Sequence, residues 1–355
     1  MNKSALIFML LVAMVLVVPG NASAVPPVLG TPTIDSPQLL DWGQDVNNGE
    51  PDLTEQTANR LVDLHGSFSD CDIALSTAGN YHMALRDLWY DIYLPQYASE
   101  LGLKNWFFTT SPPVALKQLK NGAVVFGNMS LRCMPQLAVG PQKVINDLKA
   151  AGLTEGQQIP IFRNRGNVLL VKKGNPKHIL TIWDLGRPNI VISTPNQNYE
   201  KNTFDNYSGS IYNIAMNDAA HAPDGWDAGR LFNSIFGPDK IKENGTNHPK
   251  WVAGEKIHHR EVPWSIAYGR ADVAVIFYHL ALDAVRRFPD TFEIVSLGGT
   301  IDNPQPLPGN QVGAHFAVRI NGTWSDKQVQ ARERLIDAFN SAEFTSILEK
   351  HGLQR

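Results

Sequence analysis

Hydroxyl and amide side chains follow the strands that the sequence predicts. In the first half of the chain the turns after three such strands contain Ser76, Thr77, Asn80, Thr110, Ser111 and Asn128. A similar group, Ser193, Thr194 and Asn196, follows a later strand. An anion taken from water must recover its hydration from fixed donors, which such side chains and helix N-termini supply. The pattern predicts an anion site, although the same residue types are preferred N-caps in any helical protein.

The elements that carry these turns repeat a strand–turn–helix pattern. Apolar strands are expected at 73–75, 106–108 and 123–126, and apolar residues at helical spacing follow at 83–97 and 114–119. Such repetition predicts a parallel α/β sheet whose polar turns lie on one edge.

The segment Asn167–Asp184 (N-V-L-L-V-K-K-G-N-P-K-H-I-L-T-I-W-D) reads as an apolar strand, a tight turn and a short helix. This pattern is typical of a chain crossing into a second α/β lobe. We expect hinge strands at 168–172 and between 296 and 314. Ligands of two-lobed α/β chains usually bind between the lobes. The expected organisation is residues 1–24 as a signal peptide, 25–69 as an extension, 70–160 plus 298–355 as lobe 1, and 161–297 as lobe 2.

Three further side chains are candidates for ligand contact. Tyr207 is expected near the start of a helix, where it could cap that helix or close over a ligand. Arg260 offers a bidentate guanidinium to a carboxylate or oxyanion, or it pairs with Glu261 beside it. Tyr278, followed by His279, ends the apolar strand 272–278, and each either reaches the cleft or packs in the core.

The N-terminus reads as an export signal. Lys3 precedes an apolar run, and Ala22 and Ala24 place small residues where a signal peptidase cleaves. The extension that follows is rich in Pro, Gly, Asp and Asn, with a helix expected at 54–65. Export permits a disulfide between the two cysteines, at positions 71 and 133, but nothing in the sequence decides whether they pair.

Several function classes find little support. With 31 Lys and Arg against 34 Asp and Glu, the chain is a poor candidate for nucleic acid or anionic membranes. It lacks the G-x-S-x-G, G-x-x-x-x-G-K-[ST] and strand-borne G-x-G-x-x-G motifs, so neither an enzyme nor a cofactor is expected. The adjacent His258 and His259, with His221 and His248, lack metal-ligand spacing and are expected at the surface or behind the site.

Residues 70–355 resemble the type II periplasmic solute-binding proteins of ABC transporters, most closely their molybdate-binding-like branch. The resemblance rests on the Ser76-Thr77 turn, on L-L-V-K-K-G-N-P with I-W-D-L, and on N-I-V-I-S-T-P, Ile266–Val275 and the tail F-N-S-A-E-F-T-S-I-L-E-K-H-G-L. The 25–70 extension, Pro112-Pro113 and the insert at 218–256 depart from that branch.

The resemblance implies a monomeric periplasmic protein with two α/β lobes and a hinged cleft. Its ligand would be a tetrahedral oxyanion such as molybdate or tungstate, which it delivers to a membrane ABC permease. The alternatives are a small organic carboxylate as ligand, or an accessory protein that reports its ligand to a membrane receptor.

Overall fold

The computed structural model describes residues 63–66, 72–77, 81–103, 106–111, 114, 116–122, 124–126, 129–131, 134–198, 200–237, 250–254 and 258–355. For 63–66, 106–111, 124–126, 129–131 and Arg260 the description covers the backbone only. The predicted signal peptide, both cysteines, Asn80 and Asn128 lie outside the described residues.

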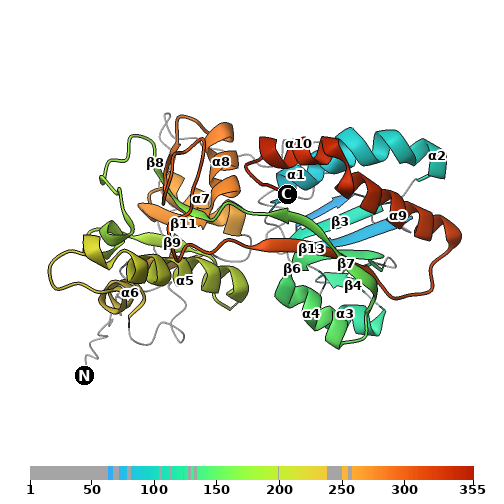
Figure 1. Cartoon of the computed structure of the whole chain (residues 1–355), viewed down its shortest axis with the longest axis horizontal. Coiled ribbons are helices and arrows are strands. Elements are labelled where there is room, and N and C mark those ends of the chain that lie inside the picture. Colours follow the sequence, from blue (N-terminus) through green and yellow to red (C-terminus); the bar gives the residue numbers. More distant parts are fainter. Residues whose placement is uncertain are drawn as a thin grey trace, which may run out of the picture.

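Two lobes each contain one main sheet, with helices on both faces (Figure 1). The strands of lobe 1 are β1 (Asp63–Gly66), β2 (Ile73–Thr77), β3 (Trp106–Ser111), β6 (Leu137–Pro141), β7 (Thr154–Arg163) and β13 (Ala314–Ile320). Those of lobe 2 are β8 (Asn167–Lys172), β9 (Ile192–Thr194), β10 (Trp251–Ala253), β11 (Val273–Phe277) and β12 (Phe292–Val295). The predicted fold class, α/β with two mixed sheets flanked by helices, is confirmed.

Both sheets follow the same plan. The order in lobe 1 is β1-β3-β2-β6-β13-β7, and the order in lobe 2 is β10-β9-β11-β8-β12. In each lobe three neighbouring strands are parallel: β3, β2 and β6 in one, β10, β9 and β11 in the other. The next strand, β13 or β8, has just entered from the other lobe and runs antiparallel to both of its neighbours. Each sheet therefore contains one antiparallel strand that the chain forms directly after crossing from the other lobe.

The chain crosses between the lobes twice. The first crossing, 164–166, joins β7 to β8, and the second, 296–313, joins β12 to β13. The prediction that 168–172 forms the first hinge strand is wrong, because these residues lie in β8 inside the sheet of lobe 2. Asn167 pairs with Phe277 at the end of β11, and His315 pairs with Pro141 at the end of β6. The carboxyl ends of the parallel strands in both lobes therefore lie next to the crossings.

The helices of lobe 1 cover the two faces of its sheet. α1 (His82–Asp87) continues as the π-helical segment η3 (Leu88–Ala98) and α2 (Ser99–Leu101), and packs with α9 (Asp326–Asn340) and α10 (Ala342–Lys350) on the face of Ile73 and Leu75. α3 (Leu116–Asn121) and α4 (Gln142–Ala150) cover the opposite face, where Ala74 points. This alternation is that of a strand buried on both sides.

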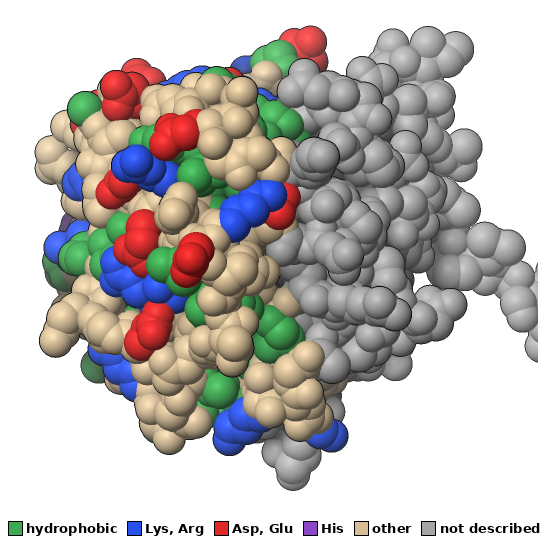
Figure 2. Space-filling view, turned by 90° about the vertical axis from the view of Figure 1, so that its right-hand side faces the viewer, with side chains coloured by type: hydrophobic (Ala, Val, Ile, Leu, Met, Phe, Trp, Pro, Cys, Tyr) green, Lys and Arg blue, Asp and Glu red, His purple; other side chains and the backbone are tan. Residues whose placement is uncertain are grey.

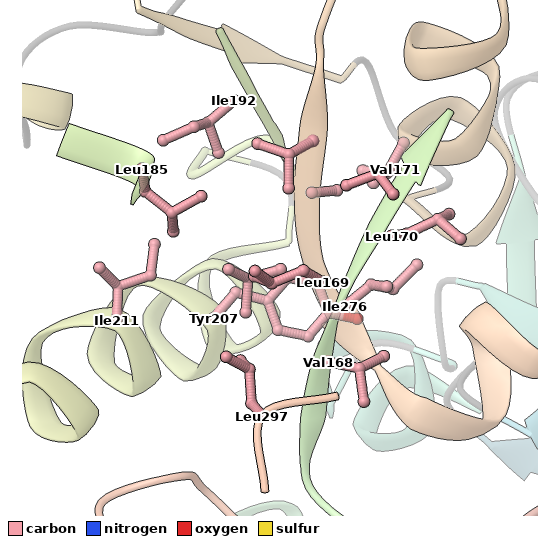
Figure 3. Packing of buried hydrophobic residues seen from close by; sticks show 14 of the residues in the cluster. Val168, Leu169, Leu170, Val171, Leu185, Ile192, Tyr207, Ile211, Ile276 and Leu297 are labelled. Carbon is pink, nitrogen blue, oxygen red and sulfur yellow. The ribbon is translucent and has the colours of Figure 1, made fainter. Parts of the chain in front are cut away.

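Lobe 2 has the same layered arrangement. One face of its sheet is covered by η4 (Ile182–Gly186), α5 (Lys201–Asn217) and α6 (Ala228–Phe236). The other face is covered by α7 (His258–Ala267) and α8 (Tyr278–Arg287). The short η5 (Ala219–His221) follows α5 in the chain. Leu169 lies by Tyr207 and Ile211 of α5 in the core around β8 (Figure 3). Because neighbouring strand residues alternate, Leu170 and its cross-strand partner Ala274 point toward α7 and α8.

Several predicted elements are corrected by the structure. β4 (Val124–Phe126) is not the third strand of the main sheet, because it pairs with β5 (Met129–Leu131) in a separate two-stranded sheet. The third parallel strand is β6, which the sequence analysis missed. Residues 63–65 of the helix expected at 54–65 lie in strand β1. α5 begins at Lys201, six residues before Tyr207, so Tyr207 is not at a helix start.

Charges of both signs lie next to one another on the described part of the surface at the lobe 1 end (Figure 2). Arg319 of β13, for example, donates to Glu333 of α9 at 2.9 Å. Across the described ranges, no helix is both long and apolar enough to cross a membrane.

Candidate functional site

Four helices whose N-cap residues the structure describes begin at the edge where the two lobes meet. α1, α4, α5 and α8 each follow a parallel strand whose carboxyl end lies at this boundary. None of their N-cap residues makes a side-chain cap: Tyr81, Pro141, Glu200 and Phe277. Three helices that begin elsewhere are capped by their own N-cap side chains, namely Asp227 of α6, Ser325 of α9 and Ser341 of α10. The first turns of these helices thus lack the usual side-chain acceptor, although the N–H of Tyr278 donates to the carbonyl of Gly166 and that of Thr203 to the carbonyl of Glu200, both at 3.0 Å.

In lobe 1 the hydroxyl groups of Ser76 and Thr77 form hydrogen bonds within the fold at the end of β2. Ser76 Oγ accepts a hydrogen bond from the backbone N–H of Val114 at 2.9 Å, and a bond of 2.6 Å joins Thr77 Oγ1 to the hydroxyl of Tyr81. Ser76 also lines a small, mainly apolar cavity of about 210 Å³ between the sheet and α3 and α4. Both hydroxyls thus have a structural use. Thr110 and Ser111 lie in β3, with only their backbone described.

In lobe 2 the predicted group divides into paired and unpaired side chains. Thr194 Oγ1 accepts the indole hydrogen of Trp251 and donates to the carbonyl of Pro195. Asn196 Nδ2 donates to the carbonyl of Gly254 at 2.9 Å. Ser193, fully buried, has a hydroxyl without a hydrogen-bond partner among the described residues. Its register with Ala274 places it on the face of the sheet that α7 covers.

The remaining candidates differ in their surroundings. The hydroxyl of Tyr207 accepts the backbone N–H of Phe277 at 3.3 Å inside lobe 2, and burial raises the pKa of this phenol well above its ordinary value. Tyr278, the first residue of α8, donates its hydroxyl hydrogen to the carbonyl of Ile301 at 2.8 Å. The side chain of Arg260 lies outside the described residues. Its role as a clamp stays a prediction.

Three histidines meet across the boundary. We call His82, His258 and His259 the inter-lobe histidine cluster. His82 of α1 stacks on His259 of α7, with ring centroids 4.6 Å apart and an interplanar angle of 26°. His258 meets His259 edge-on at 5.7 Å. All three are buried, so of the two alternatives predicted for 258 and 259 the surface position is wrong, and a position behind the site stays a prediction.

Two carboxylates from lobe 2 flank this cluster. Glu200 contacts His258 twice: Oε2 lies against Nδ1, and Oε1 accepts the backbone N–H at 3.3 Å. Asp283 lies 3.8 Å from Nε2 of His82 and also pairs with Arg287 at 3.1 Å. Within the described part of the chain no three His, Cys, Asp or Glu side chains are placed to hold a metal ion. The cluster is therefore a set of hydrogen-bonding and aromatic groups.

A second contact joins the lobes on the side of α10. Arg286 of α8 donates to the carbonyl of Lys350 at the end of α10. Lys350 and His351 both bind Asp87 of α1 at 2.7 Å. Burial alone would raise the pKa of Asp87, but these hydrogen bonds outweigh it and hold the pKa well below its usual range. The end of α10 is thus fixed to both α1 and α8.

A cavity of about 580 Å³ lies against α5 and α6, with a different location from the predicted site. The residues that line it are Gln197, Asn198, Lys201, Phe204, Asp205, Ser208, Gly209, Tyr212 and Phe232. Lys201 and Asp205 on its wall are paired with each other. These charges are therefore already satisfied.

Sequence reasoning overlooked His82 and Glu200. His82 is the first residue of α1, the helix that follows β2, and Glu200 is the N-cap residue of α5, the helix that follows β9. A signal for both was present, because each lies a few residues beyond a predicted hydroxyl-rich strand end. Asp283, in the second turn of α8, had no comparable signal.

Two lobes of the same plan with buried polar groups between them define a two-domain binding protein. The chain belongs to the bacterial extracellular solute-binding proteins, because a sequence profile of that family matches residues 135–354, more than half of its length. The resemblance drawn from the sequence is thereby confirmed for the family. Among curated protein sequences none matches.

Solved structures similar to this chain include three from named bacteria. Peb3 of Campylobacter jejuni is 15% identical, with a TM-score of 0.46 over 80% of this chain and 99% of that one. The sulfate-binding protein SubI of Mycobacterium tuberculosis is 14% identical, with a TM-score of 0.49 over 80% and 86%. The periplasmic molybdate-binding protein of Azotobacter vinelandii is 12% identical, with a TM-score of 0.47 over 80% and 99%.

Proposed function

We propose that this protein captures a small anion between its two lobes in the periplasm and delivers it to an ABC permease. The anion is a tetrahedral oxyanion such as molybdate or tungstate. Binding draws the lobes together about the two crossings, and the permease recognises the closed form of a monomer. Residues 1–24 direct export and are then removed.

The observation that carries this proposal is the contrast between the helix starts. The boundary helices α1, α4, α5 and α8 lack a side-chain cap at the N-cap position, whereas α6, α9 and α10 have one. Uncapped N–H groups at a helix N-terminus, together with the partial positive charge there, favour an anion. Because such ends come from both lobes, an anion between them would be bound by both.

Ser193 supports the same reading. A buried hydroxyl without a partner costs free energy, and native proteins keep few of them without a reason. The hydroxyl of Ser193 has no partner within the described residues. Donation of its hydrogen to a bound anion would remove that cost.

A small organic carboxylate is the second candidate. The rings of His82 and His259 offer buried aromatic surface at the boundary. A bare oxyanion gains little from such surface, whereas a carboxylate with a carbon skeleton packs against it. An accessory role, in which the bound protein signals to a membrane receptor, would use the same closure with a different partner.

A thermal-shift screen of the mature chain tests the proposal. The probes are sulfate, molybdate, tungstate and oxalate, with glucose, Mg²⁺ and Zn²⁺ as neutral and cationic comparisons. A probe at 100 times its Kd adds about 2.7 kcal/mol to the free energy of unfolding. We expect stabilisation by an anion; stabilisation by glucose or a cation alone would refute the ligand class.

A further inference from the structure

His258 is held in one orientation by Glu200. The carboxylate contacts both Nδ1 of the ring and the backbone N–H of His258, which is the first residue of α7. A negative charge at a helix start interacts favourably with the helix dipole. With its ring fixed at Nδ1, His258 presents Nε2 in a defined direction.

The other ring nitrogen is buried and unpaired. The side chain of His258 is 3% exposed, and its Nε2 makes no hydrogen bond to any residue that the structure describes. Because a carboxylate only accepts hydrogen bonds, Nδ1 carries a hydrogen. Nε2 therefore carries a second hydrogen, and can donate it, only when the ring is a cation.

Among the described residues, the charged and titratable groups around this ring are few. From α5, Glu200 bonds to it and Tyr207 meets it edge-on at 5.9 Å, as a neutral phenol because burial raises its pKa. On α7 itself, His259 lies edge-on, and the carboxylate of Glu261 lies by Gly254, toward β10.

The charged and titratable groups one contact further from His258 are paired with one another. His82 of α1 stacks on His259 and lies 3.8 Å from Asp283 of α8, which in turn binds Arg287. Glu200 is thus the acidic group that contacts His258 directly among the described residues.

We propose that His258 contacts the bound anion by donating its Nε2 hydrogen, so that binding takes up one proton from solution onto this ring. The inference rests on the proposed function, since it requires an anion between the lobes. Glu200 is a positioning residue: it orients the ring through Nδ1 without touching the anion.

Calorimetric titration of the mature chain tests this coupling. Sulfate, molybdate and oxalate serve as probes because each keeps its charge between about pH 6 and about pH 8, the range in which histidine titrates. Repeating the titration in buffers of different ionisation enthalpy counts the protons taken up. We expect about one proton, and a wild-type affinity that falls with rising pH by up to about tenfold per unit.

Four variants separate contact from structure. His258→Gln retains an N–H donor that does not titrate, so binding should persist without pH dependence. His258→Phe removes the donor and should weaken binding about 10- to 100-fold. Glu200→Gln removes the carboxylate that holds the ring at Nδ1, so the pH profile of its affinity should differ from that of the wild type. His221→Gln is the matched control, because His221 is exposed and paired with Asp218 at 2.6 Å, and it should match the wild type.

The outcomes distinguish this inference from the proposed function. If no anion binds the wild-type chain, the proposed function fails and the inference fails with it. If an anion binds without proton uptake, or His258→Gln keeps the wild-type pH profile, the role of His258 is refuted while anion binding stands. Thermal unfolding of each variant without anion shows whether it folds. If His258→Phe does not fold, the number of protons that the wild type takes up on binding still tests the role of His258.

Discussion

Asn310 binds the backbone of Asn167 through two hydrogen bonds of 2.8 Å, one accepted by its side-chain oxygen and one donated by its side-chain nitrogen. Asn310 lies on the second crossing, and Asn167 is the first residue of β8, directly after the first crossing. Asn164 repeats this relation with Gly313, since its Oδ1 accepts the Gly313 N–H at 3.1 Å and its own N–H donates to the Gly313 carbonyl at 2.9 Å. The crossings are thus joined to each other, and the lobes must move about them as a pair.

Asn310→Ala should lower the free energy of unfolding by about 2 kcal/mol, because it leaves a buried N–H and a buried carbonyl of Asn167 without partners. Urea unfolding measures this loss. Asn340→Ala is the control, since Asn340 is exposed at the end of α9, and its effect should stay within about 0.5 kcal/mol. Equal stabilities of the two variants would show that the Asn310 pair does not hold the crossings together.

Ser193→Ala and Thr194→Val should have opposite consequences. Ser193→Ala removes a hydroxyl that no described residue satisfies, so stability should be kept or slightly raised while anion affinity falls about tenfold. Thr194→Val leaves the indole N–H of Trp251 unpaired and should cost about 1–3 kcal/mol. Calorimetric titration and urea unfolding of both variants check this. A Ser193→Ala protein that binds the anion like the wild type would remove Ser193 from the site.

His315 should make the protein less stable in mild acid. Burial lowers the pKa of its ring from 6.5 to about 4. Between these values the unfolded chain binds more protons than the folded one, so stability falls as the pH drops through this window and levels off below it. The gap corresponds to about 3 kcal/mol.

His315→Phe should remove this part of the acid sensitivity, since a phenyl ring can keep the stacking on Phe162, whose ring centroid lies 4.4 Å away. Urea unfolding at about pH 6.5 and about pH 4 gives the difference between wild type and variant. A difference that is the same at both pH values would contradict the assignment.

Thr77 and Tyr81 should show coupled effects on stability. Their hydrogen bond closes the turn between β2 and α1, and both residues are fully buried. In a double-mutant cycle, Thr77→Val and Tyr81→Phe should have a coupling energy of about 1 kcal/mol. Additive effects would mean that the two hydroxyls do not depend on each other.

Much of the fold could be predicted because burial leaves a pattern in the sequence. β8 and β11 are buried on both faces and are continuous runs of β-branched and aliphatic residues. β7 was missed for the opposite reason. It lies at the edge of its sheet with an exposed side, so it tolerates Gly156, Pro160 and polar residues that read as a loop.

The third parallel strand was assigned to the wrong segment. Val124–Phe126 is as apolar as Leu137–Pro141, and local pattern alone does not distinguish a strand of the main sheet from one of a small hairpin. The start of α5 could not be predicted from a capping residue either, because its N-cap residue is Glu200, whose side chain does not cap the helix.

The candidate site was only partly predictable. Strand ends could be located, so Ser76, Thr77, Ser193 and Thr194 were expected at one edge of each sheet. Whether a hydroxyl is already used by the fold depends on a distant partner, as with Thr194 and Trp251. The stacking of His82 on His259 joins residues from different lobes, and no local spacing signals it.

Hydrogen–deuterium exchange with and without the anion that gives the largest thermal shift tests the central claim most directly. The account predicts slower exchange in the first turns of α1 and α4 in lobe 1 and of α5 and α8 in lobe 2, with little change at the capped starts of α6 and α9. Protection confined to one lobe, or centred on α6 or α9, would contradict capture of an anion between the lobes.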